Sequence, residues 1–291
     1  MISKIENKKG GGACSPLPYK GGIKMKRYLI LVFLILLSST LFGESVKYPL
    51  VFNDPVNDDK GPGTYVYPTN AVFKPGSFDL TKVVIDADNE NVYFKISFRV
   101  PIENPWGSPL GLSIQTIHIY IDKDGKENSG FRDFIPGVRA QTTPKSAWDI
   151  AILVEGWPTE LKASVKSSAP EMYKACIFPT KGVSVEGNTI IIPVPKKSLG
   201  GDFEKGWGFQ VLILGQEGFP TQDPVSCRIR EVLSSPQQWR FGGGDDFYGD
   251  PNIIDMLDYE GINQYEVLSK YKSDAKYEKN VYAQIPFIYV K

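Results

Sequence analysis

Histidine is almost absent from this sequence of 291 residues, and His118 is its single example. A zinc site built from several histidines is therefore excluded, and a Ser-His-Asp triad is disfavoured. His118 stands between two isoleucines in an alternating stretch, which favours a structural or surface role over a catalytic one. Gly-x-Ser-x-Gly, Cys-x-x-Cys, phosphate-binding glycine loops and the dinucleotide fingerprint are also missing. A pair of carboxylates, which is all that a glycosidase needs, remains open.

Cysteine is scarce as well, with three residues in the whole chain. Cys14 lies near the N-terminus, which leaves Cys176 and Cys227 in the body of the sequence. In an exported protein these two could form one disulfide. The alternative is that both are buried as small apolar side chains. The spacing alone does not decide between them.

The sequence has no apolar run of the ~20 residues that a membrane-spanning helix needs. The nine apolar residues Leu29–Leu37 instead follow Lys26 and Arg27 and precede a stretch of small residues that ends at Gly43. This order of basic, apolar and small residues predicts a secretory signal peptide over residues 25–43. An uncleaved N-terminal anchor is the alternative interpretation.

Residues 1–24 do not suit the start of a secreted precursor. Gly21-Gly22 would be encoded by GGN-GGN codons just ahead of Met25, where a bacterial ribosome-binding site belongs. We therefore interpret residues 1–24 as a translated leader and Met25 as the true start. Beyond residue 43 the chain keeps 26 basic and 32 acidic residues, a net charge of −6. A mildly acidic exported protein is not expected to bind nucleic acid or an anionic membrane.

Short strands separated by turns dominate the rest of the chain. With 22 prolines, 28 glycines, 16 phenylalanines and 15 tyrosines, the composition suits strands and tight turns. Asn91–Val100 alternates apolar and polar residues and pairs with Phe78–Asp86 in a predicted hairpin. Further strands are predicted over Leu112–Asp122, Trp148–Glu155, Ala163–Lys166, Lys174–Phe178, Gly182–Glu186, Thr189–Val194, Gly208–Leu214, Ser226–Val232 and Tyr282–Val290.

Helix signals are few and lie near the C-terminus. Asp250-Pro251 resembles a helix start, with Asp as N-cap and Pro at the first helical position. The spacing of Ile262, Tyr265, Leu268 and Tyr271 predicts a short amphipathic helix. The sequence therefore predicts an all-β fold, an antiparallel β-sandwich with one or two short C-terminal helices, that forms one domain over residues 46–291.

Acidic residues gather in two loops that could hold a cation. Asp54, Asn57, Asp58 and Asp59 place four oxygen side chains before a Gly-Pro-Gly turn, and calcium prefers such ligands. The same residue types also form Asx-turns without a metal. In the second loop, Gly242–Gly244 frees the backbone for a close approach, and Asp245 and Asp246 follow at once. This second stretch is either a cation site or ligand lip, or a loop with solvated acids.

The loop that begins at Asp122 fails as an EF-hand. The pattern requires an oxygen ligand two residues beyond Asp124, and position 126 is Lys.

Aromatic residues beside polar ones suggest a sugar-binding surface. Trp106 lies close to Asn104, and Trp239 is flanked by Gln238 and Arg240. An aromatic ring can stack on the apolar face of a sugar while polar side chains bind its hydroxyls. Tyrosines in a loop rich in Pro and Thr are further candidates, and a buried role is the alternative for every one of these rings. The candidate ligand residues are Trp106, Asn104, Tyr65, Tyr67, Trp239 and Arg240.

Four blocks of sequence, from Asp54–Leu80, Asn104–Asp122, Gly206–Pro220 and Gln238–Leu257, resemble the C-terminal module of glucodextranase. The resemblance runs from about Val51 to Tyr271. It implies a jelly-roll-like or DOMON-like β-sandwich related to family 9 carbohydrate-binding modules. It also implies polysaccharide or cell-envelope binding and a structural calcium ion, with candidate ligands Asp54, Asp58, Asp59, Asp245 and Asp246.

The sequence departs from that family in two ways. No catalytic domain accompanies the module, and Leu110 stands where an asparagine is expected. Some DOMON relatives bind haem through Met and His axial ligands. Beyond residue 43 this chain has one histidine, His118, and two methionines, Met172 and Met256, so haem binding is not expected.

We therefore expect a non-catalytic, exported, calcium-stabilised module that binds α-glucan-type polysaccharide. The alternatives are a structural protein of the cell envelope, related to surface-layer modules, and a free-standing glycoside hydrolase.

Overall fold

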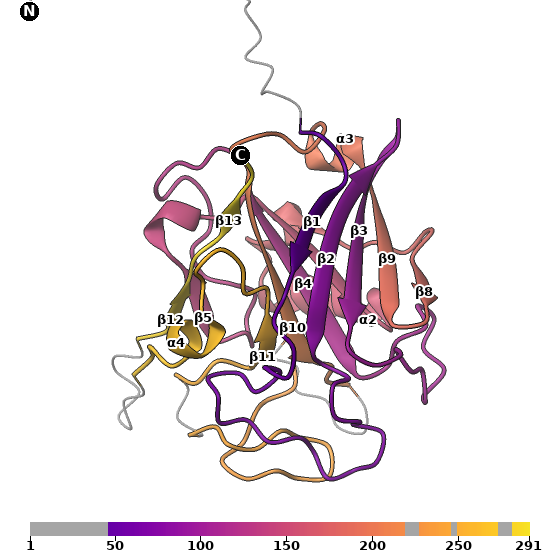
Figure 1. Ribbon diagram of the computed structural model, residues 1–291, viewed down its shortest axis with the longest axis vertical. Coiled ribbons are helices and arrows are strands. Elements are labelled where there is room, and N and C mark those ends of the chain that lie inside the picture. Colours follow the sequence, from indigo (N-terminus) through magenta and orange to yellow (C-terminus); the bar gives the residue numbers. More distant parts are fainter. Residues whose placement is uncertain (1–45, 219–226, 246–248, 273–280) are drawn as a thin grey trace, which may run out of the picture. The chain divides into compact units, whose positions relative to one another are not determined.

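The computed structural model describes residues 46–218, 227–245, 249–272 and 281–291, in which two sheets pack face to face (Figure 1). The first sheet has the order β1-β2-β3-β9-β8 and is antiparallel throughout. Its strands are β1 (Leu50–Asn53), β2 (Leu80–Ala87), β3 (Asn91–Phe98), β8 (Ser184–Glu186) and β9 (Thr189–Pro195). Residues 1–45, which carry the predicted leader and signal peptide, lie outside the described residues.

The second sheet has the order β11-β10-β4-β6-β7, and β13 pairs with β10 beside β11. Its pairs are antiparallel except β6 with β7. Its strands are β4 (Gln115–Asp122), β6 (Ile150–Glu155), β7 (Cys176–Ile177), β10 (Gly208–Gly215), β11 (Ile253–Met256) and β13 (Ile288–Tyr289). The all-β sandwich that the sequence predicts is confirmed.

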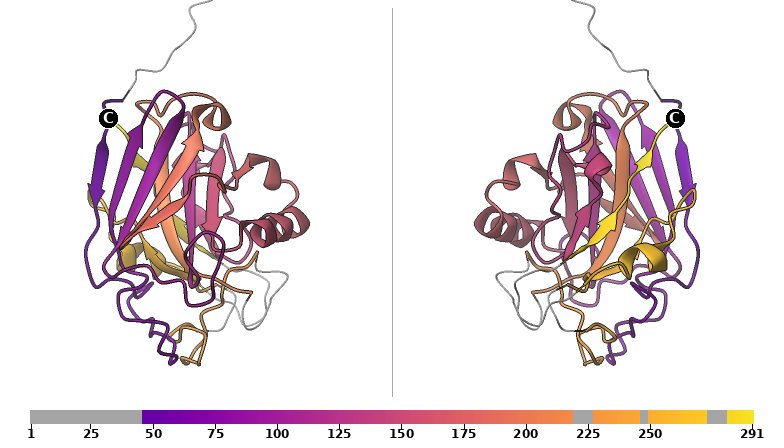
Figure 2. Two further views of the ribbon diagram at one scale, coloured as in Figure 1. Left: turned by 90° about the vertical axis from the view of Figure 1, so that its right-hand side faces the viewer. Right: turned by 90° about the vertical axis from the view of Figure 1, so that its left-hand side faces the viewer.

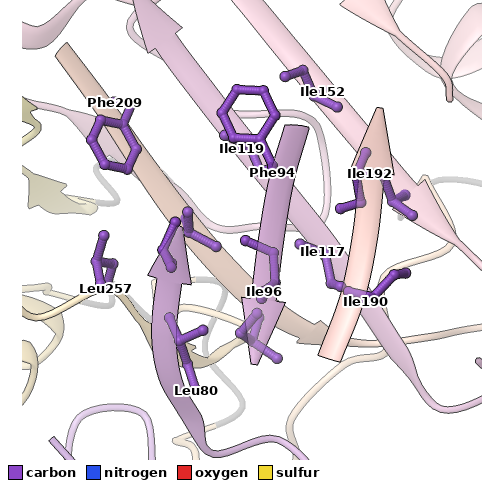
Figure 3. Packing of buried hydrophobic residues seen from close by; sticks show 14 of the residues in the cluster. Leu80, Phe94, Ile96, Ile117, Ile119, Ile152, Ile190, Ile192, Phe209 and Leu257 are labelled. Carbon is purple, nitrogen blue, oxygen red and sulfur yellow. The ribbon is translucent and has the colours of Figure 1, made fainter. Parts of the chain in front are cut away.

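The first sheet buries one face, as its sequence pattern predicts. Along β3 the side chains of Val92, Phe94, Ile96 and Phe98 are buried and alternate with half-exposed residues. They meet Ile117, Ile119 and Phe209 of the second sheet in one apolar core (Figure 3). Burial of this surface is the main stabilising contribution to the sandwich.

The second sheet is buried on both faces, and β4 and β10 are buried along their whole length. Its outer face forms a second apolar cluster around Tyr120, Trp148 and Leu212, to which Leu161 and Leu268 contribute from helices. The cover consists of α2 (Pro158–Ser168), α4 (Gln264–Leu268) and the parallel pair β5 (Ala140–Thr142) and β12 (Ala283–Ile285). Figure 2 shows α2 on the outside of this sheet. Shorter elements are η1 (Pro144–Ser146), η2 (Tyr173–Ala175) and α3 (Lys196–Leu199).

Two predicted elements are wrong. Ala163–Lys166 is not a strand but part of α2, since Pro158 opens a helix whose Leu161 and Val165, four residues apart, face the second cluster. Asp250-Pro251 does not start a helix, because the apolar residues that follow form β11, paired with β10. In both cases contacts with the second sheet override the local signal.

Two other elements are shorter than predicted. Of the predicted strand Ser226–Val232, the described residues 227–232 show one bridge, between Ile229 and Gln216, and no named strand. The closing strand is divided into β12 and β13 at Pro286. The predicted C-terminal helix is confirmed as α4, where the Asn263 side chain accepts a hydrogen bond from Glu266 N at the N-cap. Among the described residues, no helix has the length and apolar character to cross a membrane.

Cys176 and Cys227 are free thiols, half-buried and buried respectively. Both contribute to the cluster on the outer face of the second sheet. Burial raises the pKa of Cys176 to about 12 and that of Cys227 to about 11. The structure therefore agrees with two apolar packing roles and contains no disulfide between them.

His118 is fully buried, and its Nδ1 lies 2.9 Å from the Tyr120 hydroxyl. Burial lowers the pKa of His118 to about 3, because the charged imidazolium would be desolvated. Unfolded histidine has a pKa near ~6.5, so below that pH the unfolded chain binds a proton that the folded chain does not. Acidification should therefore destabilise the fold through this residue.

We expect the unfolding free energy to fall by about 1 kcal/mol more in the wild type than in His118→Leu between pH 6 and pH 5. Urea unfolding of both proteins at the two pH values measures this difference. Because both proteins contain the same carboxylates, the effect of carboxylate titration cancels in this comparison. Equal pH slopes for the two proteins would show that His118 titrates normally in the fold.

Candidate metal centre and aromatic pair

Two long loops lie together at one end of the sandwich, drawn in indigo and orange in Figure 1. One joins β1 to β2 and the other joins β10 to β11. Val66 and Gly242 form a bridge between them, and Thr69 N and Asn70 N donate to backbone carbonyls of Gln237 and Gln238. The loops therefore support each other through backbone hydrogen bonds.

The glycine run in the second loop permits this approach. Gly243 has a φ of +89°, and a Cβ at this position would lie 2.1 Å from the carbonyl oxygen of Thr64. Only glycine combines that conformation with that close contact. The close backbone approach considered for Gly242–Gly244 is present.

Three buried aspartates meet at the base of these loops. Asp54, Asp58 and Asp255 place carboxylate oxygens within 4.8 Å of one another. Their exposed fractions are 6%, 9% and 0%. Asp54 follows β1, Asp58 lies in the turn beyond it, and Asp255 comes from β11. Strand pairing thus brings together carboxylates that are some 200 positions apart in the sequence.

Hydrogen bonds orient the carboxylates of Asp54 and Asp255, while two other oxygens of the cluster are unpaired. Asp54 Oδ1 accepts from Asp258 N at 2.5 Å, and Asp255 accepts from Leu80 N at 2.7 Å and from Met256 N at 2.8 Å. Asp54 Oδ2 and Asp58 Oδ1 are buried and have no hydrogen-bond partner in the described part of the chain. Such oxygens carry a large desolvation cost unless a cation binds them.

Burial and mutual proximity disfavour the charged form of these carboxylates. Burial, followed by neighbouring carboxylates, raises the pKa of Asp54 to about 9 and that of Asp58 to about 7. Burial also raises the pKa of Asp255 well above its ordinary value. The nearby Asp79 is paired with Arg99, whose Nε lies 2.7 Å from its Oδ2. The donor set, all carboxylate oxygens, fits a hard divalent cation such as calcium.

The predicted calcium ligands are thus only partly brought together. Asp54 and Asp58 lie in the cluster, whereas Asp59 accepts a hydrogen bond from the Tyr67 hydroxyl. Asp245 is not part of the cluster; its charge acts on Asp250 and Tyr271. Asp246 lies outside the described residues. Asp255 was missed by the sequence reasoning, although a lone aspartate in the apolar run IIDML was a usable signal.

A second acidic group, Asp122, Asp124 and Asp149, lies near the start of the rejected EF-hand loop. Here the carboxylates already accept hydrogen bonds: Asp122 from Gly125 N, Asp124 from Ser129 and Asp149 from Lys123 N. Asp124 is also exposed to solvent. Nothing in this group requires a cation.

Trp106 and Trp239 form a pair at the same end of the sandwich. Their ring centroids lie 6.0 Å apart with an angle of 60° between the planes, and both side chains are half-buried. Trp239 also packs edge-on against Phe73 at 6.3 Å. Arg240, the next residue, forms an ion pair with Glu217, whose Oε2 lies 2.8 Å from its Nη2. Two indoles and a guanidinium are therefore gathered in one region.

The other candidate ligand residues have structural partners. Asn104 bonds to Ser108 N at 2.7 Å and to Ser108 O at 3.0 Å, which closes its own turn. Tyr65 is 4% exposed, and its hydroxyl donates to the carbonyl of Pro251. The ring of Tyr67 packs against Phe241. Tyr65 is therefore buried, and half-buried Tyr67 also supports the two loops.

The sequence of the chain matches a known family over most of its length. The family is described as the C-terminal binding module, SLH-like, of glucodextranase, and the match covers residues 50–283. This range includes the three clustered aspartates and both tryptophans of the pair. A comparison with curated proteins gave no match.

Proposed function

The chain belongs to the family of C-terminal, SLH-like binding modules of glucodextranase, and from this premise we propose that it is an exported, non-catalytic module that binds α-glucan-type polysaccharide. The observation that carries the proposal is the Trp106–Trp239 pair with Arg240 at one end of the sandwich. Aromatic rings supply stacking area for sugar rings, and a guanidinium supplies donors for hydroxyl oxygens. The predicted signal peptide over residues 25–43 supports export.

We also propose that a calcium ion is bound by Asp54, Asp58 and Asp255. The unpaired buried oxygens of Asp54 and Asp58 support this assignment. When bound, the ion supplies positive charge to a cluster of three buried carboxylates. The residues themselves link the loop after β1 to strand β11, and therefore hold together the end of the sandwich that carries the tryptophans.

Isothermal titration with maltodextrins tests the glucan proposal. We expect heat of binding at micromolar to millimolar sugar, which is the range that a few stacked rings and hydrogen bonds provide. The absence of heat at millimolar maltohexaose, pullulan and dextran would contradict it. Incubation of the purified protein with pullulan or dextran and measurement of reducing sugar addresses the hydrolase alternative, and we expect no release.

The description of the family as SLH-like favours one second candidate, a structural protein of the cell envelope. In that case the same surface binds an envelope polymer. Co-sedimentation with purified cell wall, with soluble maltodextrin as competitor, separates the two. Competition by the sugar supports the glucan proposal, whereas sedimentation that sugar does not affect supports the envelope role.

A further inference from the structure

A buried arginine, Arg230, contacts the backbone of Trp239. The side chain of Arg230 is 2% exposed, and its Nε donates to Gln216 O at 2.8 Å. Its Nη1 donates to the backbone carbonyl of Trp239 at 2.7 Å. Its own backbone N–H donates to Gly215 O at the end of β10. Arg230 therefore connects the position of Trp239 to a strand of the second sheet.

Glu217 joins this arginine to the residue after Trp239. Its side chain is 1% exposed, and its Oε1 lies 3.5 Å from Nη2 of Arg230. Its Oε2 lies 2.8 Å from Nη2 of Arg240, which is more exposed at 21%. One buried carboxylate thus pairs with two guanidinium groups, and these three side chains together carry a net charge of +1.

Arg240 retains unused hydrogen-bond donors. A guanidinium group carries five N–H donors. Within the residues that the structure describes, Arg240 forms an ion pair with Glu217 and keeps 21% of its side chain exposed. A guanidinium that one carboxylate holds in place suits recognition of two adjacent oxygens through its other N–H groups.

We propose that Glu217 and Arg230 are positioning residues of the Trp106–Trp239 site. Arg230 fixes the backbone of Trp239 by donating a hydrogen bond to the Trp239 carbonyl oxygen. Glu217 holds the guanidinium of Arg240, whose remaining N–H groups donate to two neighbouring hydroxyl oxygens of a glucose unit that lies against the indole pair. This inference rests on the proposed glucan function and names the residues that orient the sugar.

Preorganisation is the physical reason for such an arrangement. An exposed arginine loses side-chain entropy when it binds a ligand, and a buried ion pair removes part of that cost before the ligand arrives. Lysine presents a point charge and cannot match two oxygens in the same way. A buried pair also excludes water from the back of the site, which strengthens its hydrogen bonds.

Titration calorimetry with maltohexaose, at saturating calcium, tests the proposal. Arg240→Met should weaken binding about 10-fold or more, since hydrogen bonds from a charged group are lost. Arg240→Lys should restore only part of the affinity. Glu217→Gln should weaken binding as Arg240→Met does, and the double variant should be no weaker than Arg240→Met alone, because Glu217 acts through Arg240.

The matched control is Lys95→Met. It removes a cation that forms an ion pair with Asp86 on the outer face of the first sheet, and it should bind maltohexaose as the wild type does. Arg230→Met should change the near-ultraviolet circular dichroism of the indole pair, with Trp106→Phe to identify that signal. Melting temperatures identify any variant that fails to fold, and the more exposed Arg240 variants keep the test decisive.

The outcomes separate the two proposals. Wild-type protein that binds no maltodextrin overturns the glucan function and this inference with it. Wild-type protein that binds, together with Arg240→Met and Glu217→Gln variants that bind like Lys95→Met, overturns the inference alone. Additive losses in the double variant would also overturn the positioning role of Glu217.

Discussion

Removal of calcium should lower the melting temperature of this protein by about 5–10 °C. A ligand at 100 times its dissociation constant stabilises a fold by about 2.7 kcal/mol, and 1 kcal/mol shifts the midpoint of a domain of this size by about 2–4 °C. The reason is the cluster of Asp54, Asp58 and Asp255, whose carboxylates repel one another without a cation. Differential scanning fluorimetry in EDTA and in millimolar CaCl₂ measures the shift.

Asp58→Asn makes this prediction specific. Its Oδ1 has no hydrogen-bond partner among the described residues, so the variant removes a charge and a ligand without breaking a bond of that atom. We expect the variant to lose most of the calcium-induced shift and to melt above the wild type in EDTA, because one repelling charge is gone. Asp124→Asn, which changes the exposed member of the second acidic group, is the matched control and should respond to calcium normally. A wild type that melts identically in EDTA and calcium would refute the metal centre.

Truncation of either member of the indole pair should reduce glucan affinity about 10- to 30-fold. Aromatic residues that fill the centre of a binding surface typically contribute about 2 kcal/mol or more when they are replaced by alanine. Trp106→Ala and Trp239→Ala each remove one wall of the pair, whose centroids are 6.0 Å apart. Affinity chromatography or calorimetry with maltohexaose measures the loss.

Tyr93→Ala is the control for this series. Tyr93 lies on the outer face of the first sheet, where its hydroxyl donates a hydrogen bond to Asp88. It should bind maltohexaose with wild-type affinity. Both tryptophan variants should keep the calcium-induced melting shift, which shows that the metal centre survives. Binding by Trp239→Ala at the wild-type level would place the sugar elsewhere.

The regular hairpin at the centre of the first sheet illustrates what sequence patterns predict well. Val92, Phe94, Ile96 and Phe98 alternate in the sequence, and the same residues are buried in β3. In a strand with one buried face, every second residue is apolar. The sequence therefore predicts both the strand and its buried face. The family resemblance, which rests on long contiguous blocks, is confirmed as well.

The second sheet shows where such patterns stop. Its outer face is covered, so β4 and β10 are buried throughout and their side chains carry less of an alternating signal. The cover itself comes from α2, α4, β5 and β12, which are short and distant in sequence. The predicted strand at Ala163–Lys166 and the predicted helix start at Asp250-Pro251 are both wrong, because contacts with this sheet decide the structure of these segments. Local propensity is weak beside the apolar area that these segments bury.

The candidate site divides in the same way. Asp54 and Asp58 belong to a dense acidic loop, and composition is enough to select them. Asp255 stands alone in an apolar run and Glu217 in a Gln-Glu-Gly stretch, so both become significant only through their spatial neighbours. Residue type selects Tyr65 and Tyr67 as candidates, whereas only the structure shows that Tyr65 is buried and that both hydroxyls donate hydrogen bonds within the loops.

The amino-acid sequence alone determined the β-sandwich class, the family and the acid-rich loop, because each of these depends on patterns of contiguous residues. Tertiary structure decided which carboxylates meet and which rings pair. In the acidic cluster those contacts join Asp54 to Asp255, 201 positions apart, and arise from strand register and loop packing. Electrostatic repulsion and ring stacking act over a few ångströms of space, and no pattern of neighbours along the chain encodes that distance.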